Sequence, residues 1–241
     1  MRIIVCSDAH LDARTAGVER FDEIAESFRQ AVWHAVEPVP HADLFVFCGD
    51  LCDPDDGRDV LRASAFAVEM ATTLSANHVP SLWLAGNHDV VKDGQTTTLE
   101  PLLYLGDGNV QVAVREPLLL QRGEHVDVLA LPYSPTAYDA EEAVRRAEER
   151  AREHEARLVI FSHLMLPGMH LGSESGEMAR GKDRNFPLKA LNALRDAPAL
   201  VVSGHYHRAQ RTEDGIRVVG ALARLTFGEE TNEPGFLVVE L

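Results

Sequence analysis

The amino-acid sequence predicts an α/β fold in which strands and helices alternate along the chain. Short runs of aliphatic and β-branched residues recur, and several of the segments between them carry apolar residues at helical spacing. This alternation is typical of α/β domains. Apolar residues make up 45% of the 241 residues, which excludes a disordered chain and suffices for one domain that we expect to span residues 1–241.

Three strands and two helices are predicted in the first half of the chain. Residues 2–6 form a β-branched run that stops at a polar loop, as a buried strand does. Residues 18–36 carry apolar side chains at helical spacing and predict a helix. Two further strands are expected at 44–48 and 81–85, with a helix at 59–76 between them.

The second half of the chain repeats this pattern. Residues 139–157 are rich in Ala, Glu and Arg and predict a solvent-exposed helix. Residues 167–187 combine glycines, prolines and mixed charges, which indicates a long loop of the kind that often carries function. The strands expected in this half are 126–131, 158–161, 199–202, 216–220 and 236–241.

The chain is strongly acidic, with 38 Asp and Glu residues against 23 Lys and Arg residues and a formal net charge of −15. This charge disfavours loose electrostatic binding to nucleic acid, although two bound divalent ions would restore positive charge at a phosphate site. No apolar run reaches the roughly 18–20 residues of a membrane span, and the first residues do not resemble a signal peptide. We therefore expect a cytoplasmic protein without membrane association.

Three cysteines, an odd number, do not form a disulfide framework. Cys6 and Cys48 lie within apolar runs and are expected to be buried thiols. Cys52 closely follows an aspartate, Asp50; a buried thiol is expected there too, and the alternative is a soft metal ligand.

Polar clusters follow five of the predicted strands within one or two residues. In open α/β sheets, ligands bind beyond the carboxyl ends of the strands, so these clusters are predicted to converge on one site. The cluster Gly204-His205-x-His207 is more specific than a lone histidine because side chains two residues apart on an extended segment point the same way, and Gly86-Asn87-His88-Asp89 is more specific still. The predicted site contains Asp8, His10, Asp50, Asn87, His88, His163, His205 and His207.

Carboxylates, imidazoles and one amide oxygen favour manganese, iron or zinc over a thiolate-bound structural zinc. The number of these ligands exceeds what one ion needs, and Asp50 is the natural carboxylate to bridge two ions. Two ions about 3.5–4 Å apart polarise a phosphoryl group, generate hydroxide from water and stabilise the leaving oxygen. We therefore predict two divalent metal ions, with Mn²⁺ as the first choice and Fe or Zn²⁺ as the alternatives.

These motifs resemble the full motif set of the calcineurin-like metallophosphoesterases. The resemblance implies a metal-dependent phosphoesterase with a four-layer α-β-β-α sandwich, in which two mixed β-sheets are flanked by helices. The matching motifs are Asp8-x-His10, Gly49-Asp50-x-x-Asp53, Gly86-Asn87-His88-Asp89, His163 and Gly204-His205-x-His207.

The same resemblance implies a role for each residue. His88 would act as general acid or would stabilise the transition state, and Asp53 would orient it. The alternative for Asp53 is an acid at the start of a helix, and Asp89 is expected to be structural. One metal ion would be held by Asp8, His10, Asp50 and His207. The other would be held by Asp50, Asn87, His163 and His205.

A finer resemblance, to the phosphoesterase domain of the Mre11/SbcD DNA repair nucleases, rests on residues 7–11, 220–229 and 234–236. Ala221 departs from it, since that family usually has serine there, and residues 224–229 are alternatively an ordinary strand and turn. The chain ends at Leu241, so neither a capping domain nor the segment that binds the partner ATPase is expected. A homodimer is expected from the resemblance.

The first substrate expected is a nucleic-acid phosphodiester, attacked in line by a hydroxide that bridges the two ions. The acidic composition favours the alternative, a phosphatase or phosphodiesterase acting on a nucleotide or another small molecule. A non-catalytic scaffold, such as the retromer subunit that resembles this fold, is the remote alternative because every metal motif is intact here. The candidate substrate contacts are Arg180, Lys182, Arg184 and Arg208.

Overall fold

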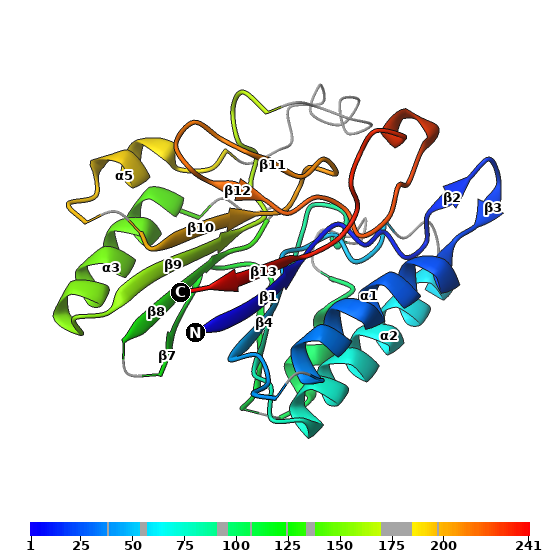
Figure 1. Ribbon diagram of the computed structural model, residues 1–241, viewed down its shortest axis with the longest axis horizontal. Helices are drawn as coiled ribbons and strands as arrows, with labels where there is room; N and C mark the ends of the chain where they lie inside the picture. Colours follow the sequence, from blue (N-terminus) through cyan, green and yellow to red (C-terminus); the bar gives the residue numbers. More distant parts are fainter. Residues whose placement is uncertain are drawn as a thin grey trace.

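The computed structural model of the chain is built around two β-sheets that lie face to face, with helices on both outer sides (Figure 1). A separate two-stranded hairpin joins β2 (Arg14–Thr15) to β3 (Val18–Glu19). The structure describes residues 1–37, 39–53, 57–90, 96–106, 108–123, 125–133, 138–169, 185–196 and 198–241.

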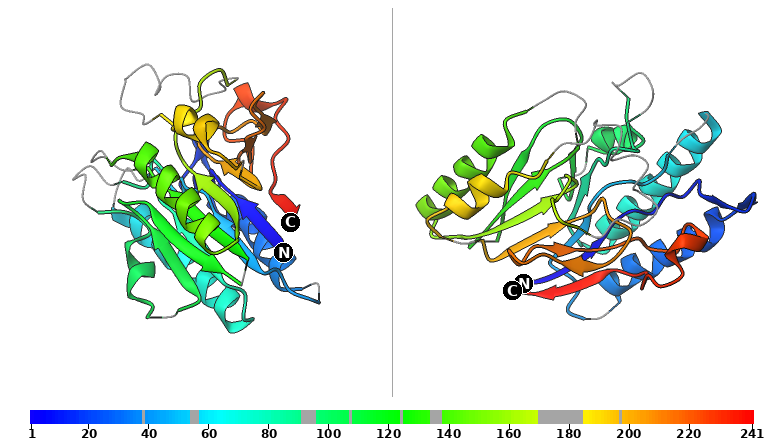
Figure 2. Two further views of the ribbon diagram at one scale, coloured as in Figure 1. Left: turned by 90° about the vertical axis from the view of Figure 1, so that its left-hand side faces the viewer. Right: turned by 90° about the horizontal axis from the view of Figure 1, so that it is seen from above.

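The first sheet has five strands in the order β13-β1-β4-β5-β6. Four of them run parallel to one another: β1 (Arg2–Cys6), β4 (Leu44–Phe47), β5 (Ser81–Leu84) and β6 (Val110–Ala113). The last strand of the chain, β13 (Leu237–Glu240), pairs with β1 antiparallel. The two chain termini therefore lie side by side in both views of Figure 2.

The second sheet has six strands in the order β11-β12-β10-β9-β8-β7. Its four inner strands are parallel: β8 (Val126–Leu131), β9 (Arg157–Ser162), β10 (Leu200–Ser203) and β12 (Arg217–Val218). Both edge strands are antiparallel to their neighbours, β7 (Leu118–Arg122) on β8 and β11 (Gln210–Arg211) on β12. Both sheets are therefore mixed.

Helices cover the outer face of each sheet (Figure 1). The first sheet is covered by α1 (Phe21–Val36) and α2 (Gly57–Ala76), with the short 3₁₀ helix η1 (Glu100–Tyr104) packed on α2. The second is covered by α3 (Ala140–Glu153) and α5 (Leu188–Ala193). The four layers confirm the sandwich expected from the motifs. A second 3₁₀ helix, η2 (Phe227–Glu229), lies in the C-terminal segment.

Buried apolar side chains fill the three spaces between the layers. Alternate residues of a strand face opposite sides, so Ile3 and Val5 of β1 pack between the sheets while Ile4 packs against the helices. On the helix side, the rings of Phe28 and Trp83 stack with centroids 5.9 Å apart. Because both faces of the central strands are buried, these strands are continuous apolar runs, which is why their positions were readable from the sequence.

Two helix boundaries predicted from the sequence were wrong. The first helix begins at Phe21 and not at residue 18, because Ala16 and Gly17 both take positive φ and turn the chain into the β2–β3 hairpin. The charged helix ends at Glu153 and not at residue 157, since Glu155 takes a φ of 50° and Arg157 starts β9. At its other end the side chain of Asp139 caps this helix.

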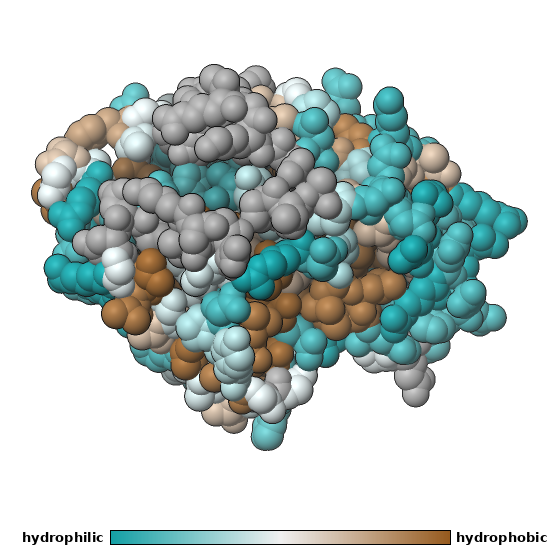
Figure 3. Space-filling model, turned by 180° about the vertical axis from the view of Figure 1, so that it is seen from behind, coloured by the Kyte–Doolittle hydropathy of each residue, from teal (hydrophilic) through white to brown (hydrophobic). Residues whose placement is uncertain are grey.

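One face of the molecule carries both polar and apolar residues. In the view of Figure 3, hydrophilic residues dominate the right-hand side, and apolar residues gather in the middle and at the lower left. Exposed large apolar side chains among the described residues include Trp33, Leu61 and Phe227. Within the described part of the chain, no helix is both long enough and apolar enough to cross a lipid bilayer.

Candidate metal centre

The predicted site residues follow the carboxyl ends of five parallel strands, three in the first sheet and two in the second. These strands are β1, β4, β5, β9 and β10, and their ends meet at one side of the sandwich. In strand order, the residues are Asp8 and His10, then Asp50, then Asn87 and His88, then His163, and last His205 and His207. The structure brings six of them into two compact groups that can each hold a metal ion, and Asn87 joins the second.

The first group consists of Asp8, His10 and His207, whose ligand atoms lie within 4.8 Å of one another. The Nε2 atoms of His10 and His207 face each other at 3.2 Å. Both carboxylate oxygens of Asp8 are buried and lack a hydrogen-bond partner in the described part of the chain. Buried acceptors without a donor are costly unless a cation satisfies them, so this group fits a metal ion.

The second group consists of Asp50, His163 and His205, again with ligand atoms within 4.8 Å of one another. The side-chain oxygen of Asn87 lies 2.9 Å from His205 Nδ1 and 3.2 Å from His163 Nε2. An amide oxygen, a carboxylate and two imidazoles thus converge on one point. This donor set suits a hard or borderline divalent ion.

Asp50 lies between the two groups. Its Oδ2 atom is 3.0 Å from His163 Nε2 in the second group and 3.8 Å from His10 Nε2 in the first. Its Oδ1 atom accepts a hydrogen bond of 2.9 Å from the backbone N–H of His88. The carboxylate is therefore fixed where it can contact two ions, which is the position that the motif resemblance implies for it.

Four of the proposed ligands have an uncommon backbone conformation. Asp8, His10, Asp50 and His205 take φ values of 51°, 46°, 62° and 78°, in the left-handed region that side chains other than glycine rarely occupy. Such strain costs of order 1–3 kcal/mol for each residue and persists where the surroundings enforce it, most often at functional sites. For His205 it also corrects the expectation of an extended segment, since His205 and His207 enter different groups.

Backbone hydrogen bonds hold the first two ligand loops side by side. The N–H of Asp8 donates to the carbonyl of Gly49 at 2.9 Å, and the N–H of Leu11 donates to that of Leu51 at 2.8 Å. These bonds continue the pairing of β1 with β4 beyond the ends of both strands. The loops are therefore extensions of the sheet, and the ligands on them are rigidly placed.

The side chain of Asp89 links the loops that follow β4 and β5. Its fully buried carboxylate accepts hydrogen bonds from the backbone N–H groups of Asp50, Leu51 and Gly86 at 2.8 to 2.9 Å. The hydroxyl of Thr98 donates to it at 2.7 Å. Asp89 was expected to be structural, and its contacts agree, since it is the acceptor that joins the loops after β4 and β5.

Two glycines permit the close approach of these loops. A Cβ atom at Gly86 would overlap the side chain of Asp50, and one at Gly204 would overlap the hydroxyl of Ser7. Both glycines come directly before residues of the second group. The motifs contain glycine at these positions because no larger residue fits between the converging loops.

Each group contains a histidine whose orientation is set by its Nδ1 partner. His163 Nδ1 bonds to the backbone carbonyl of Cys48, and His207 Nδ1 lies 2.8 Å from a carboxylate oxygen of Glu229. Both partners are acceptors, so Nδ1 carries a proton in each ring and Nε2 is the nitrogen that can bind an ion once it is deprotonated. The sequence analysis did not select Glu229 itself, although this residue lies in the segment 220–229 that resembles the Mre11/SbcD nucleases.

The electrostatics of the centre fit cation binding. Burial disfavours a charge on Asp50, but His163 and His88 nearby hold the pKa of that carboxyl well below its usual range. Burial opposes a charge on His163 too, yet the Asp50 carboxylate raises its pKa to about 9. Burial, with neighbouring imidazoles, lowers the pKa of His10 and brings that of His205 to about 3, so both rings are neutral near pH 7.

Metal binding at pH 7 is expected to release about one proton per chain, because metal ligands must be deprotonated and the ring of His163 is charged below its pKa of about 9. The affinity for metal should accordingly rise with pH up to that value. Calorimetric titration of Mn²⁺ in two buffers of different ionisation enthalpy measures the proton. Identical heats in both buffers would contradict the charged state of His163.

His88 and Asp53 lie beside the two groups. His88 Nδ1 is 3.2 Å from a carboxylate oxygen of Asp53, and the rings of His88 and His10 have centroids 5.0 Å apart. The backbone N–H of Asp53 donates to the side chain of Asp12 at 2.8 Å, which holds its loop in place. The pair is therefore arranged as the motif resemblance implies, with the acid against the imidazole.

The remaining candidates differ in their placement. Arg208 is exposed directly after the buried His207, while Arg180, Lys182 and Arg184 lie outside the described residues. Cys52 is not in either ligand group; it is fully buried in the apolar core beneath α1 and α2, and burial raises the pKa of its thiol. The alternative of a thiolate ligand at this position was therefore wrong.

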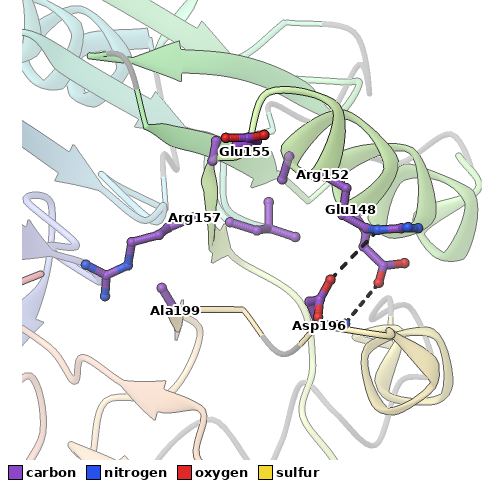
Figure 4. A pocket seen from close by; sticks show the side chains of 9 residues that line it. Glu148, Arg152, Glu155, Arg157, Asp196 and Ala199 are labelled. Atoms are coloured by element: carbon purple, nitrogen blue, oxygen red, sulfur yellow. Dashed lines mark hydrogen bonds and ion pairs between the residues drawn. The ribbon is translucent and has the colours of Figure 1, made fainter.

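A pocket of about 630 Å³ lies at the opposite, amino ends of β9 and β10 and contains none of the ligands. Figure 4 shows that charged side chains line it, among them Arg152 and Asp196, which form an ion pair. Glu148 accepts hydrogen bonds from the backbone N–H groups of Arg195 and Asp196, and Arg152 lies 3.8 Å from Asp196. These contacts join α3 to the segment after α5, and the ligand groups remain the chemically distinctive site.

Comparisons with known proteins agree with this centre. A family model described as calcineurin-like phosphoesterase matches residues 1–209, a range that includes every proposed ligand. The chain is 25% identical over 187 residues to "Putative phosphoesterase 078R" of Invertebrate iridescent virus 3, covering 78% of this chain. The match spans 49% of that relative, about half of its length.

A solved structure shows a similar fold. The alignment with the crystal structure of TT1561 of Thermus thermophilus covers 91% of this chain and 88% of the TT1561 chain, with a TM-score of 0.51 and 18% sequence identity. This likeness concerns the arrangement of sheets and helices. Since the family model spans most of the sequence and all of the ligand motifs, the chain belongs to the calcineurin-like phosphoesterase family.

Proposed function

We propose that this chain hydrolyses phosphodiesters, with a nucleic-acid strand as the substrate, and uses two divalent metal ions at the centre described above. The observation that supports a hydrolase most strongly is the pair of ligand groups that share Asp50, with the His88 and Asp53 pair beside them. Two such ions, when bound, polarise a phosphoryl group and lower the pKa of water. Manganese is the first choice among the ions that suit these ligands.

The chain's own residues have separate tasks in this reaction. Asp50 fixes the backbone of His88 through its Oδ1 atom, so the imidazole is held at a set distance from both ligand groups. Asp53 engages Nδ1 of His88 and favours the protonated ring. His88 Nε2 then donates a proton to the leaving oxygen or stabilises the charge on the transferred phosphoryl group.

The choice of a nucleic-acid diester rests on the likeness to the Mre11/SbcD nucleases in residues 7–11 and 220–229. The second of these segments lies against the centre, since the N–H of Ala221 donates to the carbonyl of His207 at 3.1 Å. Arg208, exposed beside the same histidine, is proposed to contact a substrate phosphate.

The three cysteines are free and buried, which supports a reducing, cytoplasmic location.

A nucleotide or another small phosphoester is the second candidate substrate. The net charge of −15 supports it, because an acidic surface repels a long polyanion more than it repels a small one. A homodimer, which the Mre11/SbcD likeness implies, stays a prediction. Both substrate candidates require the same metal centre.

Hydrolysis assays on the manganese-loaded chain separate the two substrates. Bis-p-nitrophenyl phosphate and single-stranded DNA represent the diesters, and p-nitrophenyl phosphate and mononucleotides represent the monoesters. We expect cleavage of the diesters that a chelator abolishes. Activity confined to monoesters would overturn the diesterase proposal and keep the metal centre.

A salt titration gives an independent test of nucleic-acid binding. Binding through several phosphates weakens steeply as salt rises, whereas binding of a single small anion changes less. We expect KM for single-stranded DNA to rise strongly between low and physiological salt. A KM that does not change with salt would favour the small substrate.

Replacing Asp53 with asparagine is expected to lower turnover by about 10-fold and to leave bound metal unchanged. This factor is at the smaller end of the range seen when a residue that orients another active-site residue is lost. Asparagine keeps the shape of the side chain but removes the charge that favours protonated His88. The matched control is Asp214→Asn, an exposed aspartate in a turn. Equal rates for the two variants would show that Asp53 is the helix-terminal acid of the alternative interpretation.

A further inference from the structure

Glu229 is a buried carboxylate in an otherwise exposed turn. It closes the short helix η2, and its neighbours Phe227, Gly228 and Glu230 are exposed, while Glu229 itself is only 1% exposed. Burying a carboxylate is costly unless hydrogen bonds or positive charge compensate it. The contacts of Glu229 therefore indicate what its burial serves.

Both oxygens of this carboxylate have a defined partner. Oε1 lies 2.8 Å from His207 Nδ1, and Oε2 accepts a hydrogen bond of 2.7 Å from the backbone N–H of Leu225. The second bond fixes the carboxylate within its own turn. The first bond then fixes the imidazole of His207, which lies 22 residues away in the sequence.

The turn itself is held against the body of the protein from two sides. The hydroxyl of Thr15 donates to the carbonyl of Leu225 at 2.7 Å, and the guanidinium of Arg20 donates to that of Arg224 at 2.7 Å. Both donors belong to the segment between His10 and α1. The segment that follows the metal ligand His10 therefore also sets the position of the Glu229 carboxylate.

The two groups differ in the partner that orients their histidines. His207 in the first group is oriented by an anionic carboxylate, whereas His163 in the second is oriented by the neutral carbonyl of Cys48. A carboxylate on Nδ1 fixes the tautomer and raises the basicity of Nε2 more than a carbonyl does. Nε2 of His207 is the atom that faces His10 across the first group.

We propose that Glu229 is a positioning residue for the first metal site, and that it holds His207 in the tautomer and orientation that bind the ion. The carboxylate does not touch the ion or the substrate; it acts through the imidazole. Loss of the Glu229 carboxylate should consequently weaken the first metal site and leave the second nearly unchanged. This inference holds for either substrate of the proposed function, because it concerns metal binding alone.

The test is a titration with Zn²⁺ followed by the ring resonances of the histidines in nuclear magnetic resonance spectra, in the presence of a competing chelator. Resonances of His10 and His207 report the first site, and those of His163 and His205 report the second. In Glu229→Gln one of the two oxygen positions becomes an NH₂ group. When the remaining oxygen keeps the hydrogen bond from the N–H of Leu225, the NH₂ group faces Nδ1 of His207 as a donor. The proton of His207 is therefore expected to move from Nδ1 to Nε2 in the metal-free chain.

In this variant the Zn²⁺ affinity of the first site is expected to fall by about 10–100-fold, the usual cost of losing an outer-shell partner. The second site should change less than the first, because Glu229 contacts His207 and neither histidine of the second group. The matched control is Glu230→Gln, which changes the neighbouring exposed glutamate and should alter neither affinity. Equal weakening of both sites, or no weakening, would overturn the proposal.

A loss of folding is distinguished by the thermal melting of the metal-free variants. If Glu229→Gln melts without cooperativity, Glu229→Asp keeps the charge on a shorter side chain and should weaken the first site alone. If neither variant melts cooperatively, Glu229 is a structural residue and the proposal is overturned. None of these readouts depends on turnover, so failure of the proposed hydrolase activity would leave this test intact.

Discussion

Replacing Asp50 with asparagine is expected to weaken both metal sites at once and to abolish measurable turnover. The carboxylate of Asp50 lies 3.0 Å from His163 in the second group and 3.8 Å from His10 in the first. Asparagine removes the negative charge. If its oxygen keeps the hydrogen bond from the N–H of His88, its NH₂ group points a donor where two ions need an acceptor.

The loss of affinity should exceed the roughly 10–100-fold that removal of an outer-shell partner costs, because a direct ligand of both ions is lost. Metal analysis after dialysis measures the content of each variant. Asp8→Asn is the matched control: Asp8 belongs to the first group alone, so one equivalent of metal should remain. Full occupancy of either site in Asp50→Asn would contradict the bridging position.

Replacing His88 with alanine is expected to lower turnover by about 10²–10⁴-fold and to leave the metal content intact, which is the usual effect of removing a general acid–base group. His88 is outside both ligand groups, and its Nδ1 atom is engaged by Asp53. Its side chain is 14% exposed, so a substrate can reach it and its loss creates little buried cavity.

Steady-state turnover of a diester, with metal analysis of the same sample, measures both parts of this prediction. The control is His34→Ala, a histidine on α1 whose ring packs against Phe236. That variant should keep full turnover. An unchanged rate in His88→Ala would contradict the catalytic role assigned to His88. Loss of metal in that variant would show that His88 is a metal ligand.

The sequence predicted the ligand-bearing strands well because these strands are buried on both faces. Runs such as residues 44–48 are continuously apolar and end abruptly at Gly49 and Asp50, so their limits are marked in the sequence itself. Convergence of the clusters followed from one rule, that ligands bind beyond the carboxyl ends of strands. The two ligand groups in the structure are divided as the motif resemblance implies.

Features that depend on packing between distant segments were not predictable in this way. Strands β6 and β7 were missed; β7 is half-buried and gains its partners only when it pairs with β8. The carboxylate of Asp89 bonds to N–H groups 38 and 39 residues away, and that of Glu229 to an imidazole 22 residues away. No local pattern marks an acid for such a contact.

Two metal ions that share the carboxylate of Asp50 define the proposed centre. A crystal structure of the manganese-loaded chain, with anomalous scattering to locate the ions, tests it. We predict two ions about 3.5–4 Å apart, with Asp50 in contact with both. The first should be held by Asp8, His10 and His207, and the second by Asn87, His163 and His205. A single ion, or an Asp50 that contacts only one of two, would contradict the account.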